Sequence, residues 1–184
     1  MLYSFIFKYN VLVLNIKMST WSVNCVNAVN KQINLEYYAS YVYHYLFSYF
    51  DRDSVGLKNI AKYFDKCSLE ERDHAHKLMV YQNKRGGKVI FSNINSHILD
   101  DSDLGLLQSF EIALQLEQDV YDSLLSLHKI GESANDPQFT DFIEGEYLEE
   151  QIEGMNELRV YISQLKLIGD SGHGQWHFNA EFND

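Results

Sequence analysis

The chain has 184 residues, enough for one domain of ordinary size. Its 15 Lys and Arg residues against 26 Asp and Glu residues give a formal net charge of −11, which argues against a nucleic-acid partner and is compatible with attracting cations. Hydrophobic residues make up 46% of the chain, so a disordered protein is excluded. The two cysteines, Cys25 and Cys67, are too few for a disulfide framework.

The first segment, residues 1–17, is apolar but is interrupted by Lys8, Asn10 and Asn15. It is too short for a transmembrane helix, and it lacks the basic start and the cleavage site of a signal peptide. We therefore expect residues 1–17 to be an N-terminal extension outside the fold and residues 18–184 to form the domain. A signal or anchor is the alternative, and it would make the protein secreted instead of cytoplasmic.

Four segments carry apolar residues at alternating spacings of three and four, which is typical of the core-facing side of a bundle helix. They cover residues 29–50, 57–81, 106–127 and 147–165. A short turn joins the first two, whereas the connection from Gly86 to Ser102 is long enough to span the bundle. The sequence therefore predicts an all-α four-helix bundle with one long crossover, followed by a short fifth helix at the C-terminus.

Capping and helix-breaking residues mark the ends of these helices. Asp53 or Ser54 is expected to cap the second helix, and Gly86 with Gly87 to end it. The residues Asp101 to Asp103 are expected to cap the third helix. Pro137 suits the first position of the fourth helix, where its missing N–H costs nothing.

Polar residues interrupt all four apolar stripes near their middles: Glu36, Glu71, His74, Glu117 and Gln151. Taking an ionised carboxylate out of water costs several kcal/mol unless it is compensated, and none of the stripes carries a Lys or Arg. Any one of these residues can be explained as a hydrogen-bonded polar group of the core. The whole set, on matching faces, indicates a site for a cation.

The donor types indicate which cation. Carboxylates with one imidazole suit iron, manganese or zinc. Glu71 and His74 are three residues apart and project from one face, as in the Glu-x-x-His unit of a carboxylate-bridged two-metal site. We expect one full position from Glu36, Glu71 and His74. The second position is weaker, with Glu71, Glu117 and either Glu36 or a water held by Gln151.

Three stretches of the chain resemble eukaryotic ferritins of the heavy, catalytic type, and the similarity runs from about Asn24 to Gly172. They read QINLEYYASYVYHYLFSYFDRDSVGLKNIAKYF, LEERDHAHKLMVYQNKRGGKV and DPQFTDFIEGEYLEEQ. The resemblance implies a ferroxidase in which two Fe(II) ions bind each subunit and are oxidised by O2 or H2O2. It also implies storage of a ferric mineral inside a hollow shell of 24 subunits, of one kind or mixed with other ferritin subunits.

By the same resemblance, the ferroxidase centre falls on the residues already singled out together with one tyrosine: Glu36, Tyr43, Glu71, His74, Glu117 and Gln151, with Glu70 beside it. The tyrosine lies on the stripe of the first helix. It would hydrogen-bond a ligand or donate an electron, and an ordinary place in the aromatic core explains it equally well.

The resemblance also implies an iron-entry channel at the threefold axes, formed by His128, Asp141 and Glu144. Acidic residues early in a helix also complement its dipole, which is the alternative explanation for the two carboxylates.

Positions that relay iron or seed mineral on the inner face correspond to Glu70, Asp73 and His76. A solvated helix face explains these three better from the sequence alone. In the tail, His173 and His177 stand where the family presents leucines to the fourfold axis. They would bind a metal there or belong to a solvated tail.

Two other functions remain as alternatives. A smaller di-iron oxygenase would need a second Glu-x-x-His, which the third and fourth helices lack. A structural or carrier shell subunit, of the yolk or secreted kind, would be favoured by an eroded ligand set, and the set is complete. We therefore expect a cytoplasmic ferroxidase that binds iron and has no nucleic-acid or membrane partner.

Overall fold

The computed structural model describes residues 21–94, 104–169 and 171–182. The expected extension at 1–17 and the expected caps at 101–103 lie outside these residues. The regular elements of the described residues are all helical: α1 (Val23–Phe50), α2 (Lys58–Lys84), α3 (Leu106–Ser133), α4 (Pro137–Ile143), the π-helical turn η1 (Glu144–Leu148), α5 (Glu149–Ile168) and α6 (Gly172–Glu181). A membrane-spanning helix is not found among the described residues.

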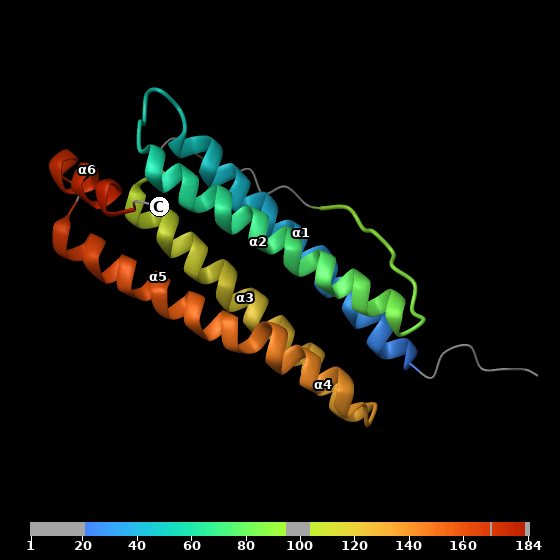
Figure 1. Cartoon of the computed structure of the whole chain (residues 1–184). Coiled ribbons are helices and arrows are strands. Elements are labelled where there is room, and N and C mark those ends of the chain that lie inside the picture. The colour runs from blue at the N-terminus through green and yellow to red at the C-terminus, as the bar shows by residue number, and fades with distance from the viewer. Residues whose placement is uncertain (1–20, 95–103, 170, 183–184) are drawn as a thin grey trace, which may run out of the picture.

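The antiparallel pair α1 and α2 lies beside a second pair formed by α3 and the run from α4 to α5 (Figure 1). After α2 the chain runs back along the first pair, so that α2 and α3 point the same way. Asn30 holds this returning segment, because its side chain donates to the carbonyl of Lys88 at 3.0 Å and accepts from the amide of Ile90 at 3.0 Å. Helix α6 lies at one end of the bundle. The predicted four-helix bundle, with its long crossover and short fifth helix, is confirmed.

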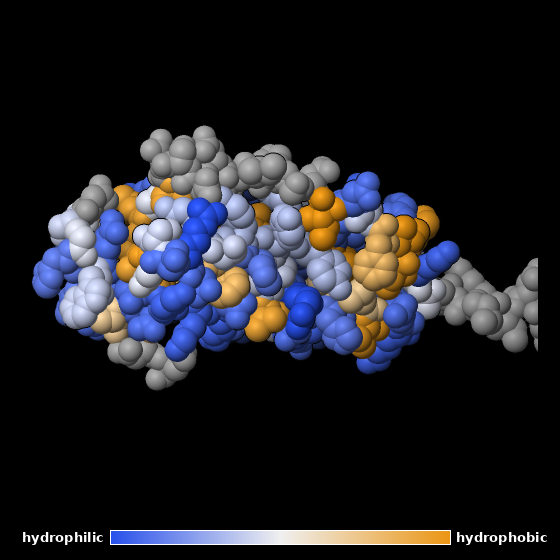
Figure 2. All heavy atoms as spheres, turned by 90° about the horizontal axis from the view of Figure 1, so that it is seen from above, coloured by the Kyte–Doolittle hydropathy of each residue, from blue (hydrophilic) through white to orange (hydrophobic). Residues whose placement is uncertain are grey.

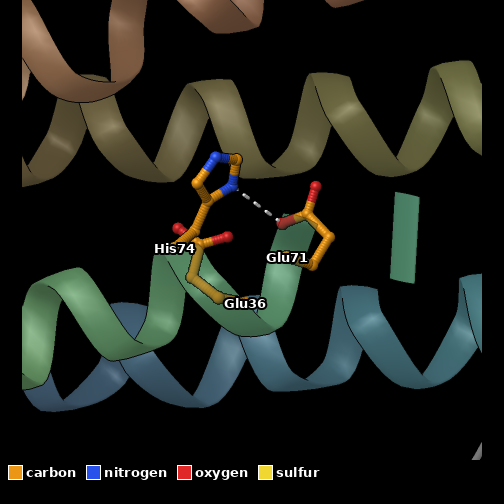
Figure 3. A group of neighbouring side chains, drawn as sticks. All are labelled: Glu36, Glu71 and His74. Atoms are coloured by element: carbon orange, nitrogen blue, oxygen red, sulfur yellow. Dashed lines mark hydrogen bonds and ion pairs between the residues drawn. The ribbon is translucent and has the colours of Figure 1, made fainter. Parts of the chain in front are cut away.

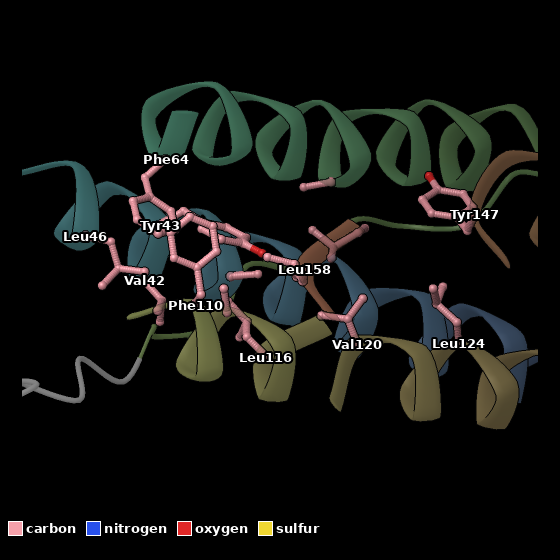
Figure 4. Close-up of a cluster of buried hydrophobic side chains, with 14 of the residues drawn as sticks. Val42, Tyr43, Leu46, Phe64, Phe110, Leu116, Val120, Leu124, Tyr147 and Leu158 are labelled. Atoms are coloured by element: carbon pink, nitrogen blue, oxygen red, sulfur yellow. The ribbon is translucent and has the colours of Figure 1, made fainter. Parts of the chain in front are cut away.

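The apolar stripes meet in a core that is rich in aromatic rings (Figure 4). Phe64 of α2 lies between Tyr43 of α1 and Phe110 of α3, with ring centroids 6.1 and 5.3 Å away. Phe178 extends the cluster from α6, at 5.8 Å from Phe110. Full burial of one such ring contributes about 1.5–3 kcal/mol, so this end of the bundle is held firmly by aromatic packing.

Helices α1 and α2 are also fixed in register by two serines. The hydroxyl of Ser40 donates to the carbonyl of Ser68 at 2.7 Å, and the hydroxyl of Ser68 donates to the carbonyl of Ser40 at 2.8 Å. Ser40 is one turn from Glu36, and Ser68 is three residues from Glu71. Side chains this small let the helices approach closely beside the candidate site.

Three expectations about the ends and the continuity of the helices were wrong. Helix α3 has Gly105 as its N-cap and no side-chain cap, so residues 101–103 do not cap it. Helix α2 has Leu57 as its N-cap and no side-chain cap, because Asp53 and Ser54 lie too far ahead of the first helical amides to reach them. The fourth helix is not continuous, because η1 divides it into α4 and α5. Residue periodicity identifies the buried face of a helix but not its hydrogen-bond register, so a π turn leaves no mark in the pattern.

The other ends agree with the expectation. Gly86 takes a positive φ of 78° directly after α2, a conformation that favours glycine. Pro137 opens α4, where Asp136 is the N-cap and accepts from the amide of Phe139 at 3.1 Å.

Apolar side chains remain on the outer surface as well as in the core (Figure 2). Several belong to α1 and to the returning segment after α2. Phe91 is 69% exposed, and its ring lies 6.3 Å from that of Tyr37. Ile90 and Tyr41 are also exposed. Apolar patches of this kind often mark contact surfaces between proteins.

Asp136 also links the end of α2 to the start of α4. Its carboxylate forms a two-pronged ion pair with Arg85, whose guanidinium also donates to the hydroxyl of Tyr81. Hydrogen bonding by Arg85 holds the pKa of Asp136 below its ordinary value.

We predict that Asp136→Ala lowers the free energy of unfolding by about 2 kcal/mol at neutral pH, because it removes both a helix cap and a charged hydrogen-bond partner. Asp136→Asn keeps a capping oxygen and should cost about half as much. A lowered folded-state pKa stabilises the protein above the unfolded pKa and loses this effect as pH falls through the folded pKa. The difference between wild type and Asp136→Asn in denaturant unfolding should therefore shrink below about pH 3.9. Equal stability of wild type and Asp136→Ala at pH 7 would contradict the prediction.

Candidate metal centre

Three of the polar residues in the stripes converge inside the bundle. Glu36 extends from α1, and Glu71 and His74 extend from α2 toward it (Figure 3). One ligand atom from each residue lies within 4.8 Å of the others. All three side chains are buried, and Glu36 is fully so. The structure thus brings together two carboxylates and one imidazole, a donor set suited to iron, manganese or zinc.

Glu36 has one satisfied oxygen and one unsatisfied oxygen. Oε1 accepts a hydrogen bond from the side-chain amide of Gln32 at 2.8 Å, and Ser123 of α3 in turn donates to Gln32. Oε2 is buried and has no hydrogen-bond partner. Leaving a buried polar atom unpaired costs about 1–3 kcal/mol, and more when the group is charged. A cation among the three side chains would remove that cost.

Burial and repulsion between neighbouring carboxylates raise the pKa values of the buried glutamates. Burial raises the pKa of Glu36 well above its ordinary value, and the charge of Glu71 raises it further. The pKa of Glu71 is raised in the same way, by burial first and then by the charge of Glu117. Both groups therefore resist ionisation until a positive charge is supplied.

Glu117 of α3 forms the other half of the cluster. One of its oxygens accepts from the hydroxyl of Tyr43, and the other accepts from the side-chain amide of Gln151, which also donates to the Glu117 carbonyl at 3.1 Å. Burial raises the pKa of Glu117, and these two hydrogen bonds oppose the rise. Tyr43 therefore combines two of the three roles considered for it, since its hydroxyl contacts a candidate ligand while its ring packs on Phe64.

A cavity of about 420 Å³ opens beside the cluster and is lined mainly by α2 and α5. Glu71, His74 and Glu117 line its inner part, and the exposed side chain of Glu70 lines it further out. Cys67, a free thiol, lies on the same wall. The cavity gives small molecules a route to the buried carboxylates.

Sequence reasoning missed Glu150, which also lines this cavity. Its Oε2 lies 3.3 Å from Nε2 of His74. Tyr147 was expected only as a core residue, yet its hydroxyl donates to the carbonyl of His74 at 3.1 Å. The presence of Glu150 next to Gln151 was the one available signal, and a glutamate on the polar side of a helix is too common to be singled out.

The expected channel residues are only partly brought together. Nε2 of His128, on α3, lies 2.6 Å from Oε1 of Glu144, at the start of η1. Asp141 is exposed on α4.

The expected inner-face and tail residues lie on the surface. Glu70 forms an ion pair with Lys66 at 3.4 Å, and Asp73 and His76 are exposed on α2. His173 and His177 are exposed on α6, where His177 lies 3.7 Å from Glu181.

Comparison with known proteins shows similarity to ferritins over most of the chain. A family model described as a ferritin-like domain matches residues 26–168. "Ferritin, chloroplastic" of Malus baccata var. xiaojinensis is 45% identical over 174 residues, which cover 93% of this chain and 69% of that protein. "Ferritin-2, chloroplastic" of Zea mays is 51% identical over 159 residues, covering 85% and 63%. "Ferritin-4, chloroplastic" of Arabidopsis thaliana is 47% identical over 169 residues, covering 90% and 65%. The chain thus spans about two thirds of the length of these relatives.

The names of these relatives contradict the expected cytoplasmic location, because all three are called chloroplastic. The expectation was wrong because it rested on the lack of secretory signal features in residues 1–17, and those features do not mark targeting to other compartments. Cellular address is carried by short targeting segments that play no part in the packing of the helices.

The bundle, the buried cluster and the comparisons point to one family. The matched region covers α2, α3, α4, η1 and α5 and nearly all of α1, and it includes every residue of the cluster. The resemblance seen in the sequence is thereby confirmed, and the chain belongs to the ferritin family.

Proposed function

We propose that this chain is an iron-storage subunit that oxidises Fe(II) to Fe(III) at the buried cluster and keeps the product as a ferric mineral inside a shell of 24 subunits. The observation that carries the proposal is the convergence of Glu36, Glu71 and His74 within 4.8 Å, with one carboxylate oxygen left without a partner. Membership of the ferritin family supports iron as the substrate.

The chemistry follows from the donors. Fe(II) bound among Glu36, Glu71 and His74 would satisfy the unpaired oxygen and neutralise the repulsion between the two acids. A second Fe(II) would bind between Glu71 and Glu117, which makes Glu71 the bridging residue. Each Fe(II) gives up one electron, and dioxygen, taking two electrons and two protons, leaves as hydrogen peroxide.

The two halves of the cluster differ in a way that suits release of the product. The half around Glu117 has hydrogen bonds from Tyr43 and Gln151 where the other half has an imidazole. Neutral hydrogen-bond donors orient the carboxylate without adding a metal ligand. Iron held there is bound more weakly and leaves more readily after oxidation.

Surface features support a shell and a route for iron. The exposed apolar side chains of α1 and of the segment after α2, among them Phe91, are suited to contact with other subunits. The close pair of His128 and Glu144, with Asp141 nearby in sequence, supports an entry channel. The exposed residues of α2, Glu70, Asp73 and His76, are proposed to relay iron on the inner face.

The alternatives are less well supported. A passive carrier has no use for several acids buried at a cost in free energy. A di-iron oxygenase would need a second histidine, and among the described residues the cluster has one imidazole.

We predict that replacing both Glu71 and His74 by Ala slows Fe(III) formation by more than about 100-fold, since removal of supporting partners alone costs up to that factor. Stopped-flow absorbance after addition of two Fe(II) per subunit measures the rate. Arg72→Ala, on the exposed side of the same helix, is the control and should leave the rate unchanged. Equally slow oxidation by wild type and double variant would leave only a passive shell.

We predict that Glu36→Gln raises the stability of the metal-free protein at neutral pH and abolishes most of its stabilisation by Zn(II). A folded-state pKa raised by burial stabilises the protein below the unfolded pKa, and this effect is lost as pH rises through the folded pKa. The stability of metal-free wild type should therefore rise relative to that of the variant when the pH is lowered from 7.5 toward about 4.3, the ordinary Glu pKa. Thermal unfolding with and without Zn(II) tests both statements. An equal Zn(II) effect on the two proteins would refute the statement about Zn(II), and a metal-free variant no more stable than metal-free wild type at pH 7.5 would refute the other.

We predict that the protein elutes in gel filtration far above the 21.5 kDa of one chain. Phe91→Asp should shift part of it to smaller species, because it puts a charge into the exposed apolar patch. Lys88→Asp, a change at an exposed polar position of the same segment, is the matched control. A single-chain elution volume for wild type would contradict assembly.

A further inference from the structure

The ring of His74 is held from several directions. Nδ1 lies 3.4 Å from Oε2 of Glu71, on the side of the cluster. Nε2, the other ring nitrogen, lies 3.3 Å from Oε2 of Glu150. The ring of Tyr147 meets the imidazole edge-on at 5.6 Å between centroids, while its hydroxyl donates to the His74 carbonyl.

These contacts bear on which nitrogen faces the metal. A neutral imidazole has one N–H and one lone pair, and only the lone pair binds a metal. When Nε2–H donates to the carboxylate of Glu150, the lone pair is on Nδ1 and points to Glu71. A carboxylate behind a metal-binding histidine fixes the ring in this way in many metal sites.

The residues that contact the ring from this side come from the π turn η1 and from the first turn of α5, which follows it. Tyr147 lies in η1, and Glu150 and Gln151 follow in the first turn of α5, three and four residues later. Spacings of three and four put all three on one side of the helix. They contact His74 and Glu117, on α2 and α3 respectively. A π turn shifts the register of everything after it by one residue, and such turns are frequent at functional sites.

We propose that Glu150 is a positioning residue for iron oxidation, which fixes the tautomer and orientation of His74 so that Nδ1 faces the metal. The π turn at Glu144–Leu148 brings Glu150 to that ring. The proposal rests on the proposed function, because it takes His74 to be a ligand of Fe(II). It assigns Glu150 a role through His74, without contact to the substrate.

Direct metal binding by Glu150 is the competing role, since this carboxylate is half exposed at the wall of the cavity. Substitution by glutamine separates the two roles. The amide oxygen of Gln still accepts a hydrogen bond from Nε2–H, but a neutral amide is a much poorer ligand than a carboxylate. The positioning role therefore predicts that Glu150→Ala weakens metal binding at His74, whereas Glu150→Gln keeps it close to the wild-type affinity.

The test is titration of the metal-free protein (residues 1–184) with Co(II) under anaerobic conditions, followed by its visible absorption. Glu150→Ala should weaken binding at the His74 position by about 10- to 100-fold, and Glu150→Gln should stay within about threefold of wild type. Glu149→Ala, the exposed neighbour on the same turn, is the matched control. Thermal unfolding without metal should be similar for all four proteins, which excludes a merely structural effect.

Each outcome has a defined meaning. Wild-type affinity in Glu150→Ala would overturn the positioning role and leave the proposed function intact. Affinity in Glu150→Gln as low as in Glu150→Ala would overturn it in favour of direct ligation. Stopped-flow Fe(II) oxidation by the same variants should follow the order of the Co(II) affinities. If wild type neither bound Co(II) nor oxidised Fe(II), the proposed function itself would fail.

Discussion

Several carboxylates are buried in the middle of a helical bundle, and the cost of keeping them there governs the rest of the structure. Glu36 is fully buried with one oxygen unpaired, and burial raises the pKa of Glu36, Glu71 and Glu117 together. A cation relieves both the desolvation and the repulsion. A bound cation would therefore stabilise this acidic cluster, which is the physical basis of the Fe(II) site proposed here.

The bundle keeps this cluster in place by rigid means. The reciprocal hydrogen bonds of Ser40 and Ser68 fix α1 against α2 beside Glu36 and Glu71. Stacked aromatic rings, including Phe64, fill the core toward one end. Neutral side chains then orient the buried carboxylates: Gln32 donates to Glu36, and Tyr43 and Gln151 donate to Glu117. Because the groups belong to long packed helices, metal can bind with little rearrangement of the backbone.

The sequence predicted correctly those features that depend on residues near one another in the chain. Polar residues within an apolar stripe identified Glu36 and His74, because the burial cost of each is fixed by its own type and position. Pro137 and Gly86 marked helix ends for equally local reasons. Asp53 failed as a cap because the length of a turn depends on how the helices it joins are packed. The cellular compartment of a protein cannot be predicted from its helical bundle, because the packing of the helices does not depend on it.

The sequence by itself determined the helical faces and the five buried polar residues of the stripes, since both follow from periodicity and burial cost. The length of the connection after Gly86 determined the crossover. Only the tertiary structure decided how those residues contact one another. The π turn at η1, the contact of Glu150 with the back of His74 and the sharing of Glu117 between Tyr43 and Gln151 depend on hydrogen-bond register and helix packing. Such contacts join residues far apart in the chain, and the residue pattern of any one helix carries no record of its neighbours.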